Sequence, residues 1–387
     1  MPSPLILATM AGQINAVKII LDKADDQMIN SVDSTGKTAL YWAVEENNPK
    51  LVKLLVEHGA TVWYSIHTCL AARNGYVECL EYMLGNLESV STNGIIIAAA
   101  ESGQIPTMKA LINRGVDVNQ SSFGVTALMT AAANGHTECV SFLLDNGAAR
   151  RHTMVNALVE AARGGHLATM KALMMHGRRG LDVNEHNLYG ESAFEVAVEN
   201  GQVEVVKFLL ENGATWDPST CLPVKDVELV KLLFDHYHGD IHAVMSRAIR
   251  RYYQELPFDV IKLFLEKGCD VNKASGVTML MGVSWTGDID CVKIVLDNGA
   301  HVNADDDNGK TALMYAAERG CDDVIQLLVD NGAHVNAVDD NGWTAFVWYG
   351  MHNQKKQVNE LLKVNSTKRP IDDSTSILMS KKTKRSS

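Results

Sequence analysis

Two blocks of apolar residues with helical spacing lie between residues 311 and 331. The first is expected to form a helix that Thr311 begins, by accepting a backbone N–H with its hydroxyl, and that Gly320 ends in a left-handed conformation. The second is expected to start near residues 322–323 and to close at Asn331-Gly332. Each block has one apolar face, formed by Leu313, Ala316 and Ala317 in the first and by Val324, Leu327 and Leu328 in the second. Neither helix can bury its face alone, so the pattern predicts stacked helix pairs.

The same pattern returns every 33 residues along much of the chain. Matching positions include Thr278, Thr311 and Thr344, and also Gly276, Gly309 and Gly342. A fixed period of this length is typical of a solenoid, whose core grows along the stack. We therefore predict an all-α array of about 11–12 helix-turn-helix repeats.

The repeat unit resembles the ankyrin repeat. The family pattern of Gly-x-Thr-Pro-Leu-His-x-Ala-Ala, Gly-His, Val-x-x-Leu-Leu and Gly-Ala-x-x-Asn is visible several times before about residue 362. The resemblance implies helix pairs with projecting β-hairpin loops, and a concave surface of hairpin tips and first helices that binds a partner protein. The Pro and His that follow the Thr in the family pattern are replaced in this chain, so the usual hydrogen bond between that Thr and His is expected to be missing. The replacements are Ala39 and Tyr41, Ala127 and Met129, and Ala312 and Met314.

The repeats fill residues 1–365, and two parts of the chain depart from them. At 215–242 two prolines interrupt the pattern, which we interpret as a local irregularity or bend in one stack, with two separate stacks as the alternative. From residue 366 the chain becomes polar, with six basic and two acidic residues up to 387. This tail has a net charge of +4 and is expected to be disordered.

Composition narrows the class of function. The chain of 387 residues has a formal net charge of −11, so the residues before the tail carry −15. This charge argues against direct binding of nucleic acid. No apolar run is long enough to span a membrane, and we expect a soluble protein without membrane partners. The seven cysteines are scattered, which favours a reducing compartment. Four of them are expected at helix positions, where they act as small hydrophobic residues: Cys79, Cys139, Cys291 and Cys321.

The exposed positions of the repeat are the candidate partner-binding residues. By alignment with the family, hairpin tips carry Phe123, Tyr189, Lys310 and Trp343, and an outward first-helix position carries Trp285. Aromatic residues are enriched at binding hot spots. The alternative is that each side chain packs on a neighbouring hairpin.

A basic–aromatic cluster on the long first helix of the ninth repeat is a second candidate. It consists of Arg247, Arg250, Arg251 and Tyr252. Arginine matches phosphate and carboxylate geometry, so the cluster could bind a phosphate, a phosphopeptide or an acidic loop. The competing interpretation is an ordinary solvated helix face. The nearby His236, His238 and His242 match no zinc signature, and no metal site is assigned.

No catalytic or cofactor motif is present. The chain has no Gly-x-Gly-x-x-Gly, phosphate-binding Gly-Lys-Ser/Thr loop, His-Glu-x-x-His or nucleophile-elbow motif after a strand, so we expect neither an enzyme nor a cofactor. The expected function is that of a non-catalytic scaffold or adaptor. The alternatives are a bacterial effector that engages host proteins, and a regulatory or inhibitory subunit of an enzyme.

The tail carries two basic groups separated by a spacer. They are Lys368 and Arg369, followed by Lys381, Lys382, Lys384 and Arg385. This arrangement is similar to a bipartite nuclear import signal, which importin would bind; the alternative is a basic tail that aids solubility. We expect a cytoplasmic or nuclear protein, in a host cell if it is an effector.

Overall fold

The computed structural model describes residues 2–85, 94–176, 181–218, 222–252, 256–273 and 276–351, apart from the side chains of Tyr64 and Tyr252. Within the chain, contacts define two compact units, Met1–Cys221 and Leu222–Ser387. Their boundary falls inside the irregular segment predicted at 215–242. Whether the repeats form one stack or two stays a prediction, as does the assignment of 1–365. The tail, with both groups of basic residues, lies outside the described residues.

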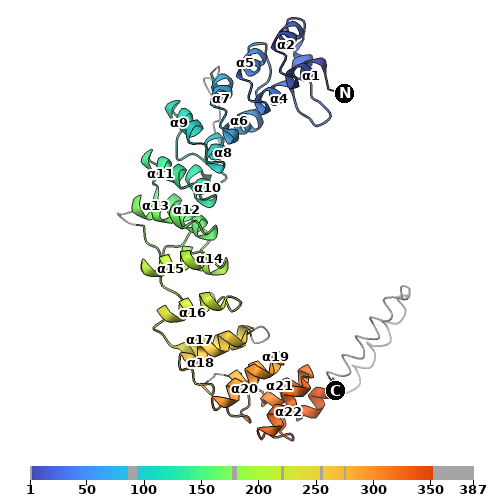
Figure 1. Ribbon diagram of the computed structural model, residues 1–387, viewed down its shortest axis with the longest axis vertical. Coiled ribbons are helices and arrows are strands. Elements are labelled where there is room, and N and C mark those ends of the chain that lie inside the picture. The colour runs from blue at the N-terminus through green and yellow to red at the C-terminus, as the bar shows by residue number, and fades with distance from the viewer. Residues whose placement is uncertain are drawn as a thin grey trace, which may run out of the picture. The chain divides into compact units, whose positions relative to one another are not determined.

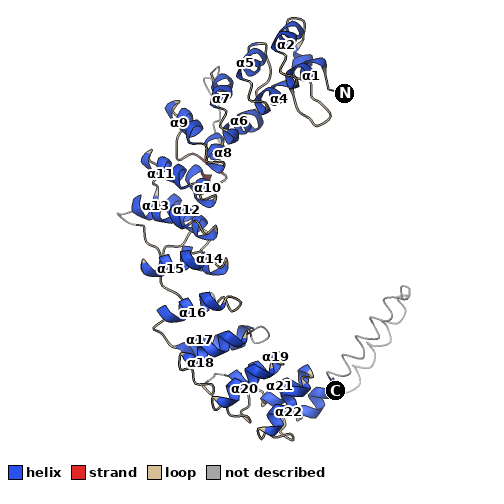
Figure 2. Ribbon diagram, viewed as in Figure 1, coloured by secondary structure: helices blue, strands red, loops and turns tan. Residues whose placement is uncertain are grey.

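The first unit is a series of short helices joined by loops (Figures 1 and 2). Its helices are α1 (Pro4–Met10), α2 (Ile14–Leu21), α3 (Asp26–Ile29), α4 (Ala39–Glu45), α5 (Pro49–Glu57), the π-helical turn η1 (Tyr64–Thr68), α6 (Cys69–Asn74), α7 (Val77–Leu84), α8 (Ile95–Glu101), α9 (Ile105–Asn113), α10 (Ala127–Ala133), α11 (Thr137–Asp145), α12 (Arg151–Arg163), α13 (Leu167–His176), α14 (Ala193–Glu199) and α15 (Val203–Glu211). Strands β1 (Ser121–Ser122) and β2 (Val125–Thr126) form a hairpin.

The second unit repeats this arrangement, and its last described residues, 345–351, are helical. Its helices are α16 (Val227–His236), α17 (Ile241–Tyr252), α18 (Phe258–Glu266), α19 (Met279–Thr286), α20 (Ile289–Asp297), α21 (Ala312–Arg319) and α22 (Asp322–Asp330). The long helix predicted for the ninth repeat is confirmed as α17. The lengthened α12 was not expected from the sequence. The all-α prediction is confirmed over the described residues.

Helix starts follow the predicted threonine caps, with one correction. The hydroxyls of Thr38, Thr126 and Thr278 accept the backbone N–H three residues on. Thr311 occupies the same capping position, but its side chain makes no capping hydrogen bond. Its extended backbone bridges to Asp305, as the backbone of Thr38 bridges to Val32. The predicted left-handed end at Gly320 is confirmed, with φ 68°.

The helices of each unit form two layers. In the first unit α10 lies between α8 and α12 in one layer, and α11 lies between α9 and α13 in the other (Figure 1). Small alanines allow the first layer to pack closely, and Ala131 and Ala161 are fully buried there. The second layer buries leucine and valine, such as Leu143. This layering follows from the two apolar faces read from the sequence.

Asparagine side chains connect neighbouring hairpins. Asn184 donates from its Nδ2 to the carbonyl of Gly213 at 3.1 Å and accepts the backbone N–H of Thr215 at 2.8 Å. In the second unit, two asparagines make the same pair of bonds, each to the repeat that follows it. Asn272 bonds to Gly299 and His301, and Asn303 bonds to Gly332 and His334. The family's Gly-Ala-x-x-Asn pattern therefore supplies polar links between repeats. The motif histidine is absent after Thr38, but His67 of the next repeat lies 3.3 Å from the Thr38 hydroxyl.

Glycine is required at the end of α10 for two reasons. Gly135 has φ 71°, a conformation that side chains other than glycine rarely adopt. A Cβ at this position would also lie 2.5 Å from Nδ1 of His166. The His166 ring is held in place because its Nε2 bonds to the carbonyl of Ala133 at 3.0 Å.

Candidate functional site

Three hairpins share a polar contact with regular spacing. In the first, Asp33 accepts the backbone N–H of Lys37 at 3.1 Å with one carboxylate oxygen and the indole N–H of Trp42 at 2.9 Å with the other. The same positions, i, i+4 and i+9, recur as Asp306, Lys310 and Tyr315, and as Asp339, Trp343 and Trp348. These bonds fix each hairpin on its own first helix. The hydrogen bond from the Thr35 hydroxyl is the largest cause holding the pKa of the Asp33 carboxyl well below its ordinary value.

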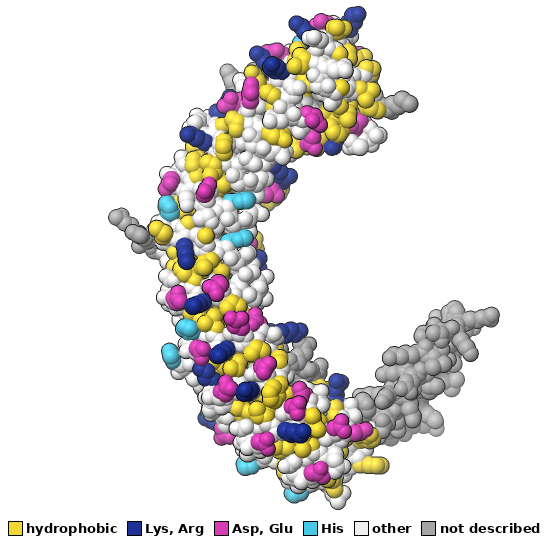
Figure 3. All heavy atoms as spheres, viewed as in Figure 1, with side chains coloured by type: hydrophobic (Ala, Val, Ile, Leu, Met, Phe, Trp, Pro, Cys, Tyr) yellow, Lys and Arg dark blue, Asp and Glu magenta, His cyan; other side chains and the backbone are white. Residues whose placement is uncertain are grey.

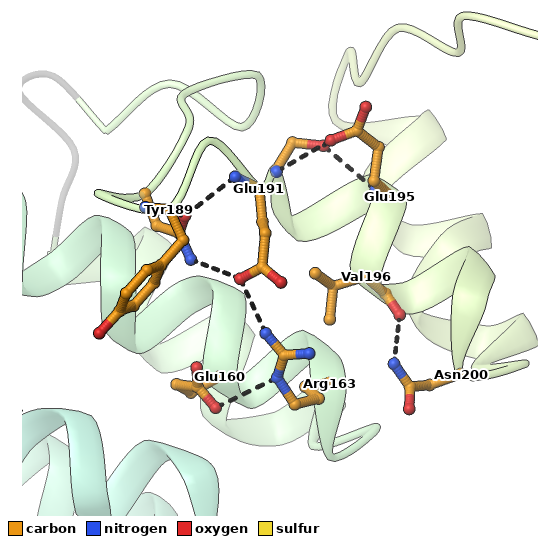
Figure 4. Close-up of polar contacts among 9 residues, drawn as sticks. Glu160, Arg163, Tyr189, Glu191, Glu195, Val196 and Asn200 are labelled. Carbon is orange, nitrogen blue, oxygen red and sulfur yellow. Dashed lines mark hydrogen bonds and ion pairs between the residues drawn. The ribbon is translucent and has the colours of Figure 1, made fainter. Parts of the chain in front are cut away.

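The hairpin before α14 uses an amide and an ion pair instead (Figure 4). Asn187 accepts the backbone N–H of Glu191 at 2.9 Å and donates to its carboxylate at 2.8 Å. Arg163, from α12 of the previous repeat, lies 2.9 Å from Glu191 and also pairs with Glu160 at 3.4 Å. The Asn187 amide, and then the Arg163 guanidinium, hold the pKa of Glu191 below its ordinary value. This cluster joins two repeats and positions the tip that carries Tyr189.

Lys310 does not point outward as expected from the alignment. Its side chain is 12% exposed and is paired with Glu318. The ammonium nitrogen lies 3.9 Å from the ring centre of Trp348 and 4.4 Å from that of Tyr315. The alignment places Lys310 at a tip, but aromatic residues from the same and the next repeat enclose it. A role for Lys310 in partner binding stays a prediction.

Trp285 and Trp343 are each half-buried against neighbouring residues. Trp285 meets Tyr315 edge to face at 6.1 Å, with the Arg319 guanidinium 5.2 Å from its ring. Trp343 lies 5.2 Å from Trp348. Both rings therefore take part in the packing between or within repeats. Their proposed contact with a partner is untested.

We expect Lys310→Met to lower the free energy of unfolding of the second unit by about 1–3 kcal/mol, because a desolvated cation–π contact and a charged hydrogen bond are lost together. Urea unfolding followed by circular dichroism measures this change. Lys293→Met is the matched control, since Lys293 is half-exposed and lies 4.0 Å from Asp290. The control should change stability by less than about 0.5 kcal/mol. Equal effects of the two variants would contradict a stabilising role for the aromatic enclosure.

Two hairpin tips of the first unit expose large apolar side chains. Phe123 is fully exposed, at 106%, and Tyr189 is 85% exposed, with Leu188 beside it at 79%. The outward positions predicted for Phe123 and Tyr189 are confirmed. The hairpins that carry them precede α10 and α14, and α12 packs between these two helices.

The basic cluster of the second unit lies on α17. Arg247, Arg250 and Arg251 are exposed, and Tyr252 ends the helix. Arg247 and Arg250 border an open groove of about 700 Å³, which also contacts the loop after α18. Arg251 is not among the residues that line it. The structure thus brings two of the predicted arginines together at one cavity.

The nearby histidines have other contacts. His236 bonds through Nδ1 to the carbonyl of Leu232 at 2.9 Å, and Asp235 pairs with Lys267 at 2.7 Å. No group of three or more histidine, cysteine, aspartate or glutamate side chains suited to hold a metal ion occurs within the part of the chain described. None of the helices described is long and apolar enough to cross a membrane.

The buried thiols have the properties of core residues. Burial raises the pKa of Cys79 and of Cys139 to about 11 and that of Cys291 to about 12. A thiol with such a pKa stays protonated near neutral pH and is a weak nucleophile. The prediction that Cys79 and Cys139 serve as small hydrophobic residues is confirmed. Cys321, predicted at a helix position, instead precedes α22 as its N-cap and is half-buried.

Some features of these surfaces were missed by sequence reasoning. An aspartate followed nine residues later by Trp or Tyr is visible in the sequence. This spacing could have linked Trp42, Tyr315 and Trp348 to their hairpins. The enclosure of Lys310 and the role of Arg163 depend on contacts between repeats, which a single sequence does not specify.

Helix pairs in two layers, with a sequence period of 33 residues along much of the chain, define a class of helical repeat solenoid. The family model for ankyrin repeats matches residues 2–65, 68–154, 150–220 and 287–372. The chain belongs to the ankyrin repeat family. Repeats of this family generally serve as protein–protein interaction modules and are typically not enzymes.

Similar proteins come from distant organisms. The Caenorhabditis elegans ankyrin repeat and KH domain-containing protein mask-1 is 27% identical over 51% of this chain and 8% of its own length. The human transient receptor potential cation channel subfamily A member 1 is 24% identical over 78% of this chain and 27% of its own length. The putative ankyrin repeat protein YahD of Escherichia coli is 26% identical over 55% of this chain and 98% of its own length. The chain spans less than a third of the first two relatives.

Proposed function

We propose that the chain is a non-catalytic scaffold that binds a partner protein, and that the exposed hairpin tips of its first unit make the primary contact. The observation that carries this proposal is the combination of exposure and backbone strain at Phe123. Its side chain is fully exposed, and its backbone has φ 49°. A large aromatic side chain that is exposed in a strained backbone position contributes little to folding.

The strain follows from the turn. Ser122 pairs with Val125, so Phe123 and Gly124 are the two central residues of the hairpin, with φ 49° and 82°. Two positive φ angles indicate a type I′ turn, which strongly prefers asparagine, aspartate or glycine. A residue such as Phe costs about 1–2 kcal/mol in this conformation. Strained residues cluster at functional sites, which supports a binding role for this side chain.

The surroundings of the two tips suggest the chemistry of the partner. Because α12 packs between α10 and α14, it lies between the two helices that follow the hairpins of Phe123 and Tyr189. Its N-terminal end carries two exposed arginines, Arg150 and Arg151, of which Arg151 pairs with Glu185 of the loop before α14 at 3.0 Å. A partner segment with apolar side chains and an acidic residue would complement this surface.

We expect the double variant Phe123→Asn and Tyr189→Asn to keep or slightly raise the thermal stability while it loses the partner, because asparagine suits the turn and removes both aromatic contacts. Affinity capture with quantitative mass spectrometry measures the loss. The matched control is Ile19→Asn with Met175→Asn, which replaces exposed apolar residues (62% and 60% exposed) on α2 and α13, the second helices of their pairs.

The partner is the protein that both the wild type and the control retain and the tip variant releases. If the tip variant retains every protein that the control retains, the tips are not the binding surface. A lowered melting temperature would instead assign the rings to folding. The identity of the retained protein distinguishes an adaptor, an inhibitory subunit and an effector that engages host proteins.

A further inference from the structure

The groove on α17 gathers cationic side chains from two directions. Ser246, Arg247 and Arg250 lie on one face of the helix, at the spacing of a single helical stripe. Lys273 faces them from the loop that follows α18. The groove, of about 700 Å³, is large enough to hold a tetrahedral oxyanion together with the residue that carries it.

Two of these cations form no ion pair with the residues that the structure describes. Arg247 and Lys273 are exposed and make no side-chain hydrogen bond or ion pair to any other residue that the structure describes. One carboxylate, that of Asp240, also borders the groove, and it accepts the backbone N–H of His242 at 3.0 Å. The lining therefore carries three positive charges, including that of Arg250, against one negative charge.

Both walls of the groove are fixed by hydrogen bonds. Nδ1 of His242, at the start of α17, accepts the backbone N–H of Asp270 at 3.2 Å, which ties the helix to the opposite loop. Asn272 bonds to the carbonyl of Gly299 and accepts the N–H of His301, so the loop is also anchored to the next repeat. Because Nδ1 accepts, neutral His242 carries its proton on Nε2, which adds a neutral donor to the groove lining. Little ordering is needed before an anion binds.

Acidic residues around the groove restrict what can bind. A Cβ on Gly276 would lie 3.1 Å from a carboxylate oxygen of Asp307 and 3.9 Å from a guanidinium nitrogen of Arg250, so the acidic hairpin 305–307 lies next to the basic lining. Acidic and basic side chains are interspersed along the visible face of this unit (Figure 3). A long polyanion would meet repulsion from these carboxylates and from a chain of net charge −11. A compact dianion would meet a lining in which three cations outnumber the single carboxylate of Asp240.

We propose that this groove binds a phosphorylated serine or threonine of a partner protein. A phosphate carries a charge close to −2 at neutral pH and three acceptor oxygens, which matches two guanidinium groups and one ammonium group. This site would make binding to the second unit depend on phosphorylation. It is separate from the tips of the first unit, shares no residue with them, and does not depend on the function proposed for them.

The test is a fluorescence-polarisation titration of the full chain with an array of labelled heptapeptides whose central residue is phosphoserine, phosphothreonine, glutamate or serine. We expect phosphopeptides to bind, and the matched serine and glutamate peptides to bind at least tenfold more weakly. The variant Arg247→Ala with Lys273→Ala should weaken phosphopeptide binding at least tenfold, because two charged hydrogen bonds are lost. Its melting temperature should not change, since both side chains are exposed.

The control variant, Lys231→Ala with Lys262→Ala, removes the same charge from exposed positions on α16 and α18, and should bind as the wild type does. Equal binding of glutamate and phosphoserine peptides would overturn the proposal in favour of a carboxylate site. Tighter binding of heparin or of phosphoinositide vesicles than of any phosphopeptide would overturn it in favour of a polyanion or a membrane surface. The proposal would also be overturned if no phosphopeptide binds when the protein is present at 1 mM, a Kd limit that corresponds to a binding free energy of roughly −4 kcal/mol.

Discussion

Acidification from about pH 6.5 to about pH 4 is expected to destabilise the first unit chiefly through one residue, His67. The side chain is 1% exposed. Its Nδ1 accepts the backbone N–H of Trp63 at 3.0 Å, and its Nε2 lies 3.3 Å from the hydroxyl of Thr38, the residue that caps α4. This arrangement requires the neutral ring with its proton on Nε2. A second proton on Nδ1 would face the N–H of Trp63 and place a charge in the core.

The direction of the effect follows from the two pKa values. Burial lowers the pKa of His67 from 6.5 to about 4 in the folded chain. Between these values the unfolded chain binds more protons than the folded chain, so stability decreases as the pH falls. The full loss is about 3 kcal/mol, and it is complete only below the folded pKa.

Urea unfolding followed by circular dichroism at pH 7.5 and pH 4.5 measures the change. His67→Asn retains an acceptor near the position of Nδ1 and removes the titration, so its stability should be lower than that of the wild type at pH 7.5 but should fall much less on acidification. His152→Asn, at an exposed position at the start of α12, is the control and should show the pH dependence of the wild type. If all three proteins lose stability in parallel, His67 is not the group responsible.

Gly135→Ala is expected to lower the free energy of unfolding by about 3–4 kcal/mol. The left-handed backbone contributes about 1–2 kcal/mol of this cost. The remainder comes from the new methyl group, which would lie 2.5 Å from a His166 ring that cannot retreat without breaking its bond to Ala133.

The chain provides a control that separates the two costs. Gly12 follows α1 as Gly135 follows α10, and has a similar φ of 67°, but a Cβ there would have no atom within 4 Å. Gly12→Ala should therefore show the backbone cost alone. Combining Gly135→Ala with His166→Ala should give a smaller loss than the sum of the two single changes, because the clash is absent. Additive losses, or equal losses for Gly12→Ala and Gly135→Ala, would refute the steric explanation.

Local sequence determined the repeat itself. Apolar spacing is set by helical geometry, so the two faces of α21 and α22 could be read directly, and the left-handed ends follow from the conformational freedom of glycine at Gly320 and Gly332. The exposure of Phe123 and Tyr189 was also predicted correctly, from their tip positions in the repeat pattern. The long helix α17 and its exposed arginines were predicted as well, because helical spacing is a local property of the sequence.

Contacts between repeats were decided by the tertiary structure. Lys310 occupies a tip position in the alignment, yet its side chain is largely enclosed because Trp285 and Trp348 approach it from the preceding and following repeats. The same holds for His67, which reaches back to Thr38 across 29 residues. The period of a solenoid specifies which repeats are neighbours. The shape and chemistry of each side chain at the junction decide whether a residue faces solvent or packs against the next repeat, and these become known only when the repeats are stacked.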